Sequence, residues 1–195
     1  APKDDLITDM VRLQAEGAPL ADEEVRVNLS ALLIGGNLTT TDLIGNGVWL
    51  LLNHPEQLAL LKADPSLAGA AVEEILRYES PVAITNRVMP ETREVGGCPM
   101  HAHQSVITSL HAANRDPEVF EDPERFDITR KHVPHVAFGG GSHICIGAPL
   151  ARIEAKQAFV RLFQRFPDLK LAQSEAPTWR ALPFFRGMEA LWVEG

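Results

Sequence analysis

Cys145 stands in a glycine-rich stretch between Phe138 and Pro149 that reads FGGGSHICIGAP. A thiolate, unlike a thiol, binds metals and attacks electrophiles, and the N–H groups at the start of a following helix favour the anion. The glycines of this stretch carry no side chain, so its backbone can approach something large and flat. These features suit an axial ligand of haem iron. A buried structural cysteine after a loop is the alternative, because free cysteines are often buried.

A second unusual stretch, Gly35-Gly36-Asn37-Leu38-Thr39-Thr40-Thr41, falls inside a long predicted helix. Glycine and β-branched residues are poor helix formers, and each glycine costs up to about 1 kcal/mol relative to alanine. A flat ligand against the backbone would explain the glycines, and a threonine bonded to a carbonyl can open a groove for a small molecule. Helix packing through small residues explains the same pattern.

Composition bounds the class of protein that carries these residues. The 195 residues are 45% hydrophobic and 23% charged, as in an ordinary soluble globular domain. The net charge of −8 argues against a nucleic acid partner. Cys98 and Cys145 form neither a disulfide framework nor a zinc pair, which fits a reducing cytoplasm. Polar residues interrupt the longest apolar stretch, 31–52, so we expect a cytoplasmic protein with no membrane partner.

Proline and glycine positions divide the chain into elements. Helices are predicted over residues 4–17, 22–53, 55–63, 68–79 and 149–166, with a short helical piece over 111–115. Alternation and turn residues predict short strands within 82–108, and a terminal β-hairpin is predicted over 178–194.

The cysteine stretch resembles the haem-binding motif of the cytochrome P-450 family in its bacterial form. The matching positions are Phe138, Gly139, Gly141, His143, Cys145 and Gly147. The resemblance implies the family's fold, mainly α with small β-sheets, and haem b with Cys145 as its axial ligand. It covers essentially the whole sequence but only the C-terminal half of the family's usual chain. We therefore expect residues 1–195 to be the C-terminal part of a single domain, without its N-terminal half.

The resemblance also implies roles around the haem. Glu74 and Arg77 match the family's Glu-x-x-Arg motif, which braces the proximal side, and Arg125 would be the third partner. The alternative for Glu74 and Arg77 is a solvated surface pair, since they lie three residues apart on one helix. Three further positions match contacts to haem propionates, with an ordinary surface charge or packed histidine as the alternative: Arg87, His135 and His143.

On the oxygen side, Gly35, Gly36 and Thr39 resemble the groove of the family's central helix, so Thr39 and Thr40 are the predicted catalytic residues. Leu38 occupies the position where the family has an acid that helps relay protons. Asn37 or Asp42 is a possible substitute for that acid.

The predicted substrate wall combines a segment after the Glu-x-x-Arg helix with two residues of the tail. Its members are Val82, Ala83, Ile84, Phe184 and Phe185. Apolar and aromatic walls suit a small apolar substrate. Ordinary core packing is the alternative for each residue.

These matches predict a monooxygenase that uses dioxygen to hydroxylate a C–H bond. Electrons would come from a ferredoxin and its reductase, or from a flavoprotein, docked near Cys145 on positive charge from Arg125, Arg152 and Lys156. The departure at Leu38 keeps two alternatives open, a peroxide-dependent haem-thiolate enzyme and a haem-binding sensor without turnover. The last alternative is that residues 1–195 are an incomplete domain that binds no ligand firmly.

Overall fold

The computed structural model describes residues 2–172 and 176–195. It forms two compact units, Ala1–Leu38 and Thr39–Gly195, and one long helix spans their boundary. The described residues are mainly helical with three two-stranded antiparallel sheets. The predicted fold class, mainly α with small β-sheets, is therefore confirmed.

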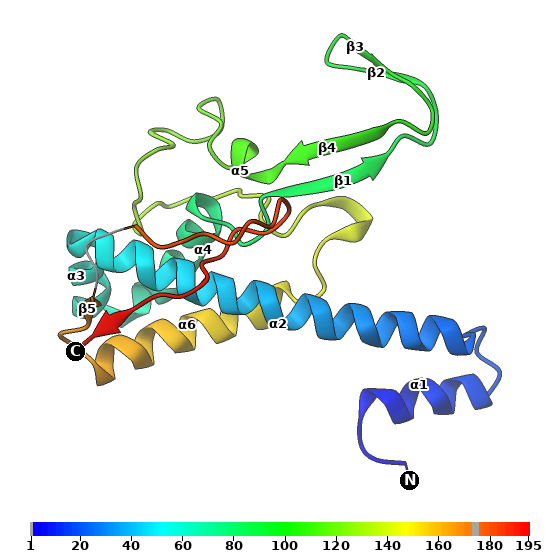
Figure 1. Cartoon of the computed structure of the whole chain (residues 1–195), viewed down its shortest axis with the longest axis horizontal. Coiled ribbons are helices and arrows are strands. Elements are labelled where there is room, and N and C mark those ends of the chain that lie inside the picture. The colour runs from blue at the N-terminus through cyan, green and yellow to red at the C-terminus, as the bar shows by residue number, and fades with distance from the viewer. Residues whose placement is uncertain (1, 173–175) are drawn as a thin grey trace. The chain divides into compact units, whose positions relative to one another are not determined.

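The α-helices lie close to the predicted ranges (Figure 1). They are α1 (Leu6–Ala15), α2 (Asp22–Asn53), α3 (Pro55–Ala63), α4 (Ala68–Tyr78), α5 (Leu110–Ala113) and α6 (Ala148–Arg165). Short 3-10 turns occupy Pro65–Leu67 and Gly141–His143. Prolines occupy the first turns of α3 and α6, where a missing N–H costs no helical bond.

The strands form ribbons in the second unit and at its tail. They are β1 (Ile84–Val88), β2 (Arg93–Val95), β3 (Cys98–Met100), β4 (Ser105–Ser109), β5 (Lys170–Leu171) and β6 (Val193–Glu194). β1 pairs with β4, and the β2–β3 hairpin extends this ribbon away from the helices (Figure 1). Gly96 and Gly97 close the hairpin at φ +60° and +80°, a left-handed conformation that glycine adopts without strain.

The terminal hairpin predicted over 178–194 forms only in part. Trp179 and Met188 make an antiparallel bridge. Val193–Glu194, however, pairs with Lys170–Leu171 outside that hairpin. The tail is therefore anchored at two places on the second unit.

The core of the second unit lies between α3, α4, α6 and the C-terminal part of α2. Gly47 of α2 lies against the ring of Phe159 and the side chain of Ile75, both fully buried. A Cβ at Gly47 would overlap the phenylalanine ring, so this glycine lets α2 approach α6 closely. This packing fixes α4 and α6, the helices that flank the cysteine loop.

Candidate functional site

The loop that carries Cys145 turns back on itself before α6. The Cys145 N–H donates to the carbonyl of Phe138 at 3.0 Å, and the Ile144 N–H donates to Gly141 at 3.2 Å. Gly139 and Gly141 have φ of +72° and +71°, which side chains other than glycine rarely adopt. The turn leaves the Cys145 thiol exposed. Within the described residues, the thiol is not packed into a core.

The start of α6 is tied directly to the cysteine. The Ala148 N–H donates to the Cys145 carbonyl at 3.3 Å, and the Ala151 N–H donates to Gly147 at 2.9 Å. A Cβ built on Gly147 would lie 3.8 Å from the cysteine sulfur, an ordinary contact. The thiol is thus fixed beside the N-terminus of α6.

The residues around Cys145 suit haem better than a bare metal ion. Among the described residues, no group of three or more His, Cys, Asp or Glu side chains could hold a metal. A single thiolate is enough for haem, because the porphyrin supplies the in-plane nitrogens. The neighbouring side chains of Ile144 and Ile146 are 61% and 86% exposed, an apolar surface of the kind that a flat macrocycle covers.

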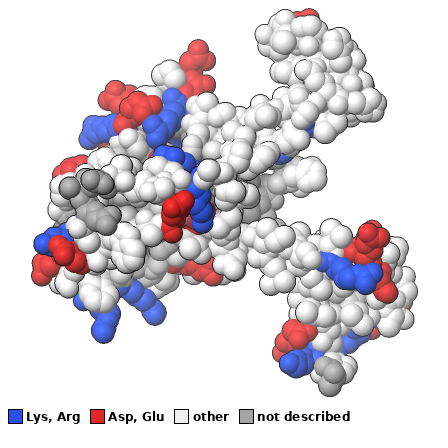
Figure 2. Space-filling view, viewed as in Figure 1, with Lys and Arg blue, Asp and Glu red and all other residues white. Residues whose placement is uncertain are grey.

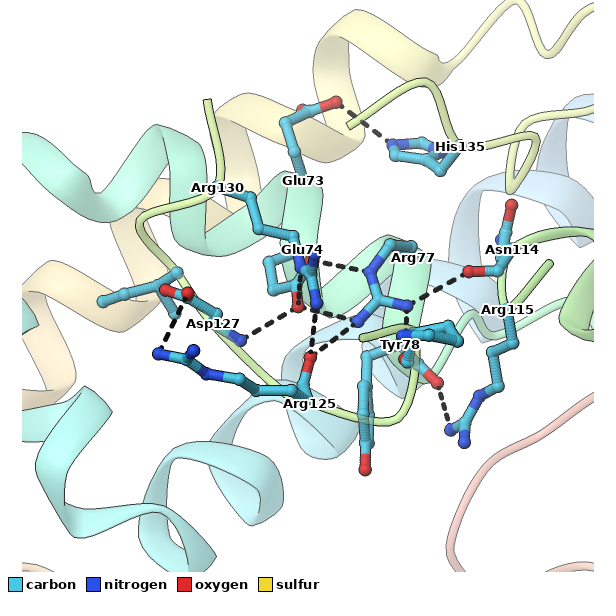
Figure 3. A network of polar contacts seen from close by, with 12 residues as sticks. Glu73, Glu74, Arg77, Tyr78, Asn114, Arg115, Arg125, Asp127, Arg130 and His135 are labelled. Atoms are coloured by element: carbon cyan, nitrogen blue, oxygen red, sulfur yellow. Dashed lines mark hydrogen bonds and ion pairs between the residues drawn. The ribbon is translucent and has the colours of Figure 1, made fainter. Parts of the chain in front are cut away.

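Glu74 and Arg77 form a buried ion pair on α4 rather than a surface pair (Figure 3). Both side chains are 0% exposed, and two hydrogen bonds of 2.7 and 2.8 Å join them. The remaining guanidinium N–H groups donate to the carbonyls of Asn114, Pro123 and Arg125. One side chain therefore organises the irregular segment that follows α5.

Asn114 connects this network to the cysteine loop by hydrogen bonds. Its side-chain Oδ1 accepts the Val136 N–H at 2.8 Å, while its backbone carbonyl accepts from Arg77. The Val136 carbonyl in turn accepts from Gly139, the first glycine of the loop. A continuous set of hydrogen bonds thus links the ion pair of α4 to the loop of Cys145.

The prediction that Arg125 supplies the third side chain of this network is wrong. The Arg125 side chain is 64% exposed and pairs with Asp127 at 3.4 Å, and only its backbone carbonyl reaches Arg77. Arg130 takes the predicted place, with Nε donating to Glu74 at 3.2 Å and a side chain 14% exposed (Figure 3). The backbone turn between the two arginines determines which of them faces α4, and no periodic pattern in the sequence predicts that turn.

His135, a predicted propionate contact, has a partner within the chain at each ring nitrogen. Its Nδ1 accepts the Ala137 N–H at 3.1 Å, so the ring proton lies on Nε2, which donates to Glu73 at 3.1 Å. The side chain is 3% exposed. Both ring nitrogens are therefore committed within the protein, and the histidine braces the loop.

Glu73 also binds Arg152 of α6 through two hydrogen bonds, of 2.6 and 2.9 Å. Burial raises the pKa of Glu73, but the hydrogen bonds from His135 and Arg152 and the charge of Arg152 outweigh it and hold that pKa at about 2. The hydrogen bond and charge of Glu73 raise the pKa of Arg152 despite partial burial, and the charge of Cys145 adds to this. Sequence reasoning missed this use of Glu73, although its place beside Glu74 on α4 was a signal.

The other two predicted propionate contacts are exposed. Arg87 lies on β1, and its guanidinium donates to the neighbouring carbonyl of Asn86 at 2.8 Å. His143 ends the 3-10 turn before Cys145. Their solvent-exposed positions are compatible with a bound anion, and their role stays a prediction.

The residues of the predicted substrate wall come together. Val82 bridges to Phe185, and the Ala83 N–H donates to the Phe184 carbonyl at 3.0 Å. Ile84 continues from them into β1. These residues are exposed or half-buried rather than core residues, and the Phe184 side chain is 43% exposed. The two segments of the predicted wall therefore lie side by side, and their role as a substrate wall stays a prediction.

The tail that carries these phenylalanines is held by buried polar contacts. Asp42, 4% exposed, forms an ion pair with Arg180. Asn46 donates to the Arg186 carbonyl at 2.9 Å, and the Arg186 side chain donates to Glu79 at 2.8 Å. Burial raises the pKa of Asp42, and the hydrogen bond and charge of Arg180 offset only part of that rise. Asp42 is thus occupied as an anchor of the tail.

The predicted oxygen groove lies along α2. Thr39 and Thr40 are half-buried in the second unit, directly after Leu38. Gly35 and Gly36 are exposed, and within their own unit a Cβ on either would meet no atom within 4 Å. The alternative of close helix packing therefore finds no support within that unit.

Positive charge near the cysteine differs from the prediction. Arg152 is neutralised by Glu73, whereas Lys156 and Arg125 are exposed. On the face shown in Figure 2, basic and acidic side chains are interspersed, without one continuous patch of either sign. Arg125 is also paired with a carboxylate, that of Asp127, and docking of a partner on these residues stays a prediction.

A mainly helical fold with a cysteine between a glycine-rich turn and a helix start is compatible with a haem-thiolate protein. Residues 65–180 match the family described as Cytochrome P450, and the chain belongs to that family. Proteins of this family bind haem b through a cysteine thiolate. The resemblance seen in the sequence is therefore confirmed.

Known proteins similar to the chain agree with this family. Cytochrome P450 107B1 of Saccharopolyspora erythraea is 48% identical over 98% of the chain and 48% of the relative. The structure of myxobacterial cytochrome P450 CYP267B1 in complex with myristic acid matches with a TM-score of 0.95 at 44% identity, over 99% of this chain and 48% of that one. CYP109E1 from Bacillus megaterium, in complex with testosterone, gives 0.95 at 38% identity, over 98% and 50%. The chain spans about half the length of the curated relatives it matches.

Among the described residues, no helix combines the length and the apolar character needed to span a bilayer.

Proposed function

We propose that the protein is a haem-thiolate monooxygenase with Cys145 as the axial ligand. The observation that carries the proposal is the exposed thiol of Cys145, fixed by a glycine turn and braced from α4 through Arg77 and Asn114. When bound, haem supplies the dioxygen chemistry, in which two electrons and two protons reduce one oxygen atom to water while the other enters a C–H bond.

The chain's own residues have positioning roles in this proposal. Arg77 and Glu74 hold the segment before the cysteine loop, and Arg130 completes their network. Arg87 and His143 supply donors for the haem carboxylates. Gly35 and Gly36 leave the backbone of α2 open to a flat group. Thr39, with Thr40 beside it, organises the hydrogen bonds through which protons reach dioxygen.

The proposed substrate is a small, mainly apolar organic molecule. The wall of Val82, Ala83, Ile84, Phe184 and Phe185 supports this class. Structures similar to the chain contain myristic acid or testosterone, both largely apolar. A ferredoxin with its reductase, or a flavoprotein, is the proposed electron donor, meeting exposed basic residues such as Lys156.

A peroxide-dependent reaction is the second candidate. Leu38 cannot carry a proton, and Asp42, the nearest acid in the following turn of α2, is held by Arg180. Peroxide brings both oxygen atoms already reduced by two electrons, together with protons, so it needs neither an electron donor nor the usual acid.

The test supplies the full-length, haem-loaded protein with a fatty acid or a steroid under two regimes. One contains labelled dioxygen, NADPH, ferredoxin and ferredoxin reductase, and the other contains hydrogen peroxide alone. Labelled hydroxylated product in the first regime supports the monooxygenase. Product only with peroxide favours the second candidate, and binding spectra without product in either regime favour a haem-binding sensor.

A further inference from the structure

We propose that Glu73 is a positioning residue that joins the two ends of the cysteine loop and compensates the charge of Arg152 beside the thiolate. This inference rests on the proposed function, because it concerns how the ligand of the haem iron is held. It gives Glu73, His135 and Arg152 a role separate from the buried pair of Glu74 and Arg77.

The geometry places Glu73 between the entry to the loop and the helix that leaves it. One carboxylate oxygen accepts from His135, ahead of the loop, at 3.1 Å (Figure 3). The same carboxylate takes both hydrogen bonds of Arg152, on α6 after the loop. Glu73 itself belongs to α4, which is packed in the core. One carboxylate thus holds three segments at fixed separations.

Arg152 connects this carboxylate to the cysteine. Its guanidinium carbon lies 4.6 Å from the centroid of the Phe138 ring, and the Phe138 carbonyl accepts the Cys145 N–H. The rings of His135 and Phe138 are 5.9 Å apart, which closes the cluster. The charge of Cys145 also contributes to the raised pKa of Arg152. Arg152 therefore packs on the residue that accepts the Cys145 N–H, which brings its charge to the cysteine loop.

The charges of Glu73 and Arg152 should affect how readily the haem site accepts an electron. Adding an electron at the site is favoured by nearby positive charge and opposed by nearby negative charge. The intact pair of Glu73 and Arg152 is nearly neutral. Removing the carboxylate leaves a cation beside the thiolate, and removing the arginine leaves an anion there.

The experiment measures the reduction potential of the full-length, haem-loaded protein and of its variants. Glu73→Gln should raise the potential and Arg152→Gln should lower it, each by roughly tenfold in the reduction equilibrium, which is about 59 mV for one electron. The double variant should return towards the wild-type value. Arg161→Gln, which removes an exposed charge further along α6, is the matched control and should leave the potential unchanged.

A purely structural role predicts a different pattern. Loosening the loop would move the potential in the same direction for both single variants, and the double variant would not recover; that result overturns the inference. If Glu73→Gln loads no haem, Arg152→Lys and Arg152→Gln decide instead. The reduction potential of Arg152→Lys should stay near that of the wild type, because the positive charge is kept. Equal potentials for the two variants contradict the charge role. A wild-type protein that forms no thiolate-type carbon monoxide complex overturns the proposed function itself, which is a separate outcome.

Discussion

Arg77 and Glu74 lie one turn apart on α4, with both side chains fully buried and joined by hydrogen bonds of 2.7 and 2.8 Å. The guanidinium also donates to the carbonyls of Asn114, Pro123 and Arg125. Removing one partner of such a pair leaves an uncompensated buried charge, at a cost of about 3–5 kcal/mol. The pair therefore acts on everything that Asn114 positions, including the loop of Cys145.

The two candidate arginines of this network should differ in their effect on stability. Arg130→Ala removes a largely buried partner of Glu74 and should lower the free energy of unfolding by about 1–3 kcal/mol. Arg125→Ala removes an exposed pair and should cost about 1 kcal/mol or less. Urea unfolding of the full-length protein measures both. A larger effect at Arg125 would contradict the assignment.

Stability should depend on the ionisation of Glu73 in acid. Its pKa of about 2 in the folded protein lies below the ordinary glutamate value of 4.5, so the folded state favours the carboxylate. The resulting stabilisation is fully present above about pH 4.5 and is lost as the pH falls towards 2. At pH 7 it amounts to about 1–3 kcal/mol, reduced by the partial exposure of Arg152.

Unfolding of the wild type and of Glu73→Gln at pH 7 and pH 3 tests this dependence. The difference between them should shrink at pH 3. Glu154→Gln replaces an exposed residue of α6, and its free energy of unfolding should match that of the wild type at both pH values. A gap for Glu73→Gln that is constant between pH 7 and pH 3 would rule out the linkage.

Gly187 is required by the anchor of the tail. A Cβ there would overlap the side chains of Asp42 and Arg180. Gly187→Ala should therefore force this pair apart and lower stability by about 1–3 kcal/mol. Gly69→Ala is the matched control, since its Cβ meets no described atom within 4 Å and alanine favours the α4 helix by up to about 1 kcal/mol. Thermal unfolding compares the two, and equal effects would argue against the anchor.

An acid at position 38 should improve the use of electrons if proton supply limits turnover. Leu38→Asp is expected to raise the amount of product formed per NADPH consumed, because a carboxylic acid beside Thr39 can pass protons on. Leu38→Asn has similar size and polarity but no such proton, so it should give no gain. An equal gain with asparagine would show that polarity, and not proton transfer, is responsible.

Much of the fold follows from local sequence signals. Pro55 and Pro149 mark the starts of α3 and α6 closely, because proline suits the first turn of a helix and is poorly tolerated further in. The spread of short strands between α4 and α5 follows from alternation and from Gly96-Gly97. The pairing of the tail did not follow, since β5 and β6 have only two residues each.

The cysteine loop and the Glu74–Arg77 pair could be predicted from sequence motifs, whereas the other supports of the loop could not. Arg125 and Arg130 fall in one irregular segment, where turn geometry and not periodicity selects the residue that faces Glu74. Asp42 and Arg180 are separated by 138 positions, so nothing local links them. His135 matched a motif, yet its partner was decided by the fold of α4 beneath it.

The spectrum of the reduced, full-length protein with and without carbon monoxide tests the central claim most directly. We expect a strongly red-shifted Soret band for the wild type, as for thiolate opposite carbon monoxide, and loss of that band in Cys145→Ala. A histidine-like band in the wild type, or a red-shifted band that survives in Cys145→Ala, would contradict the assignment of Cys145 as the haem ligand.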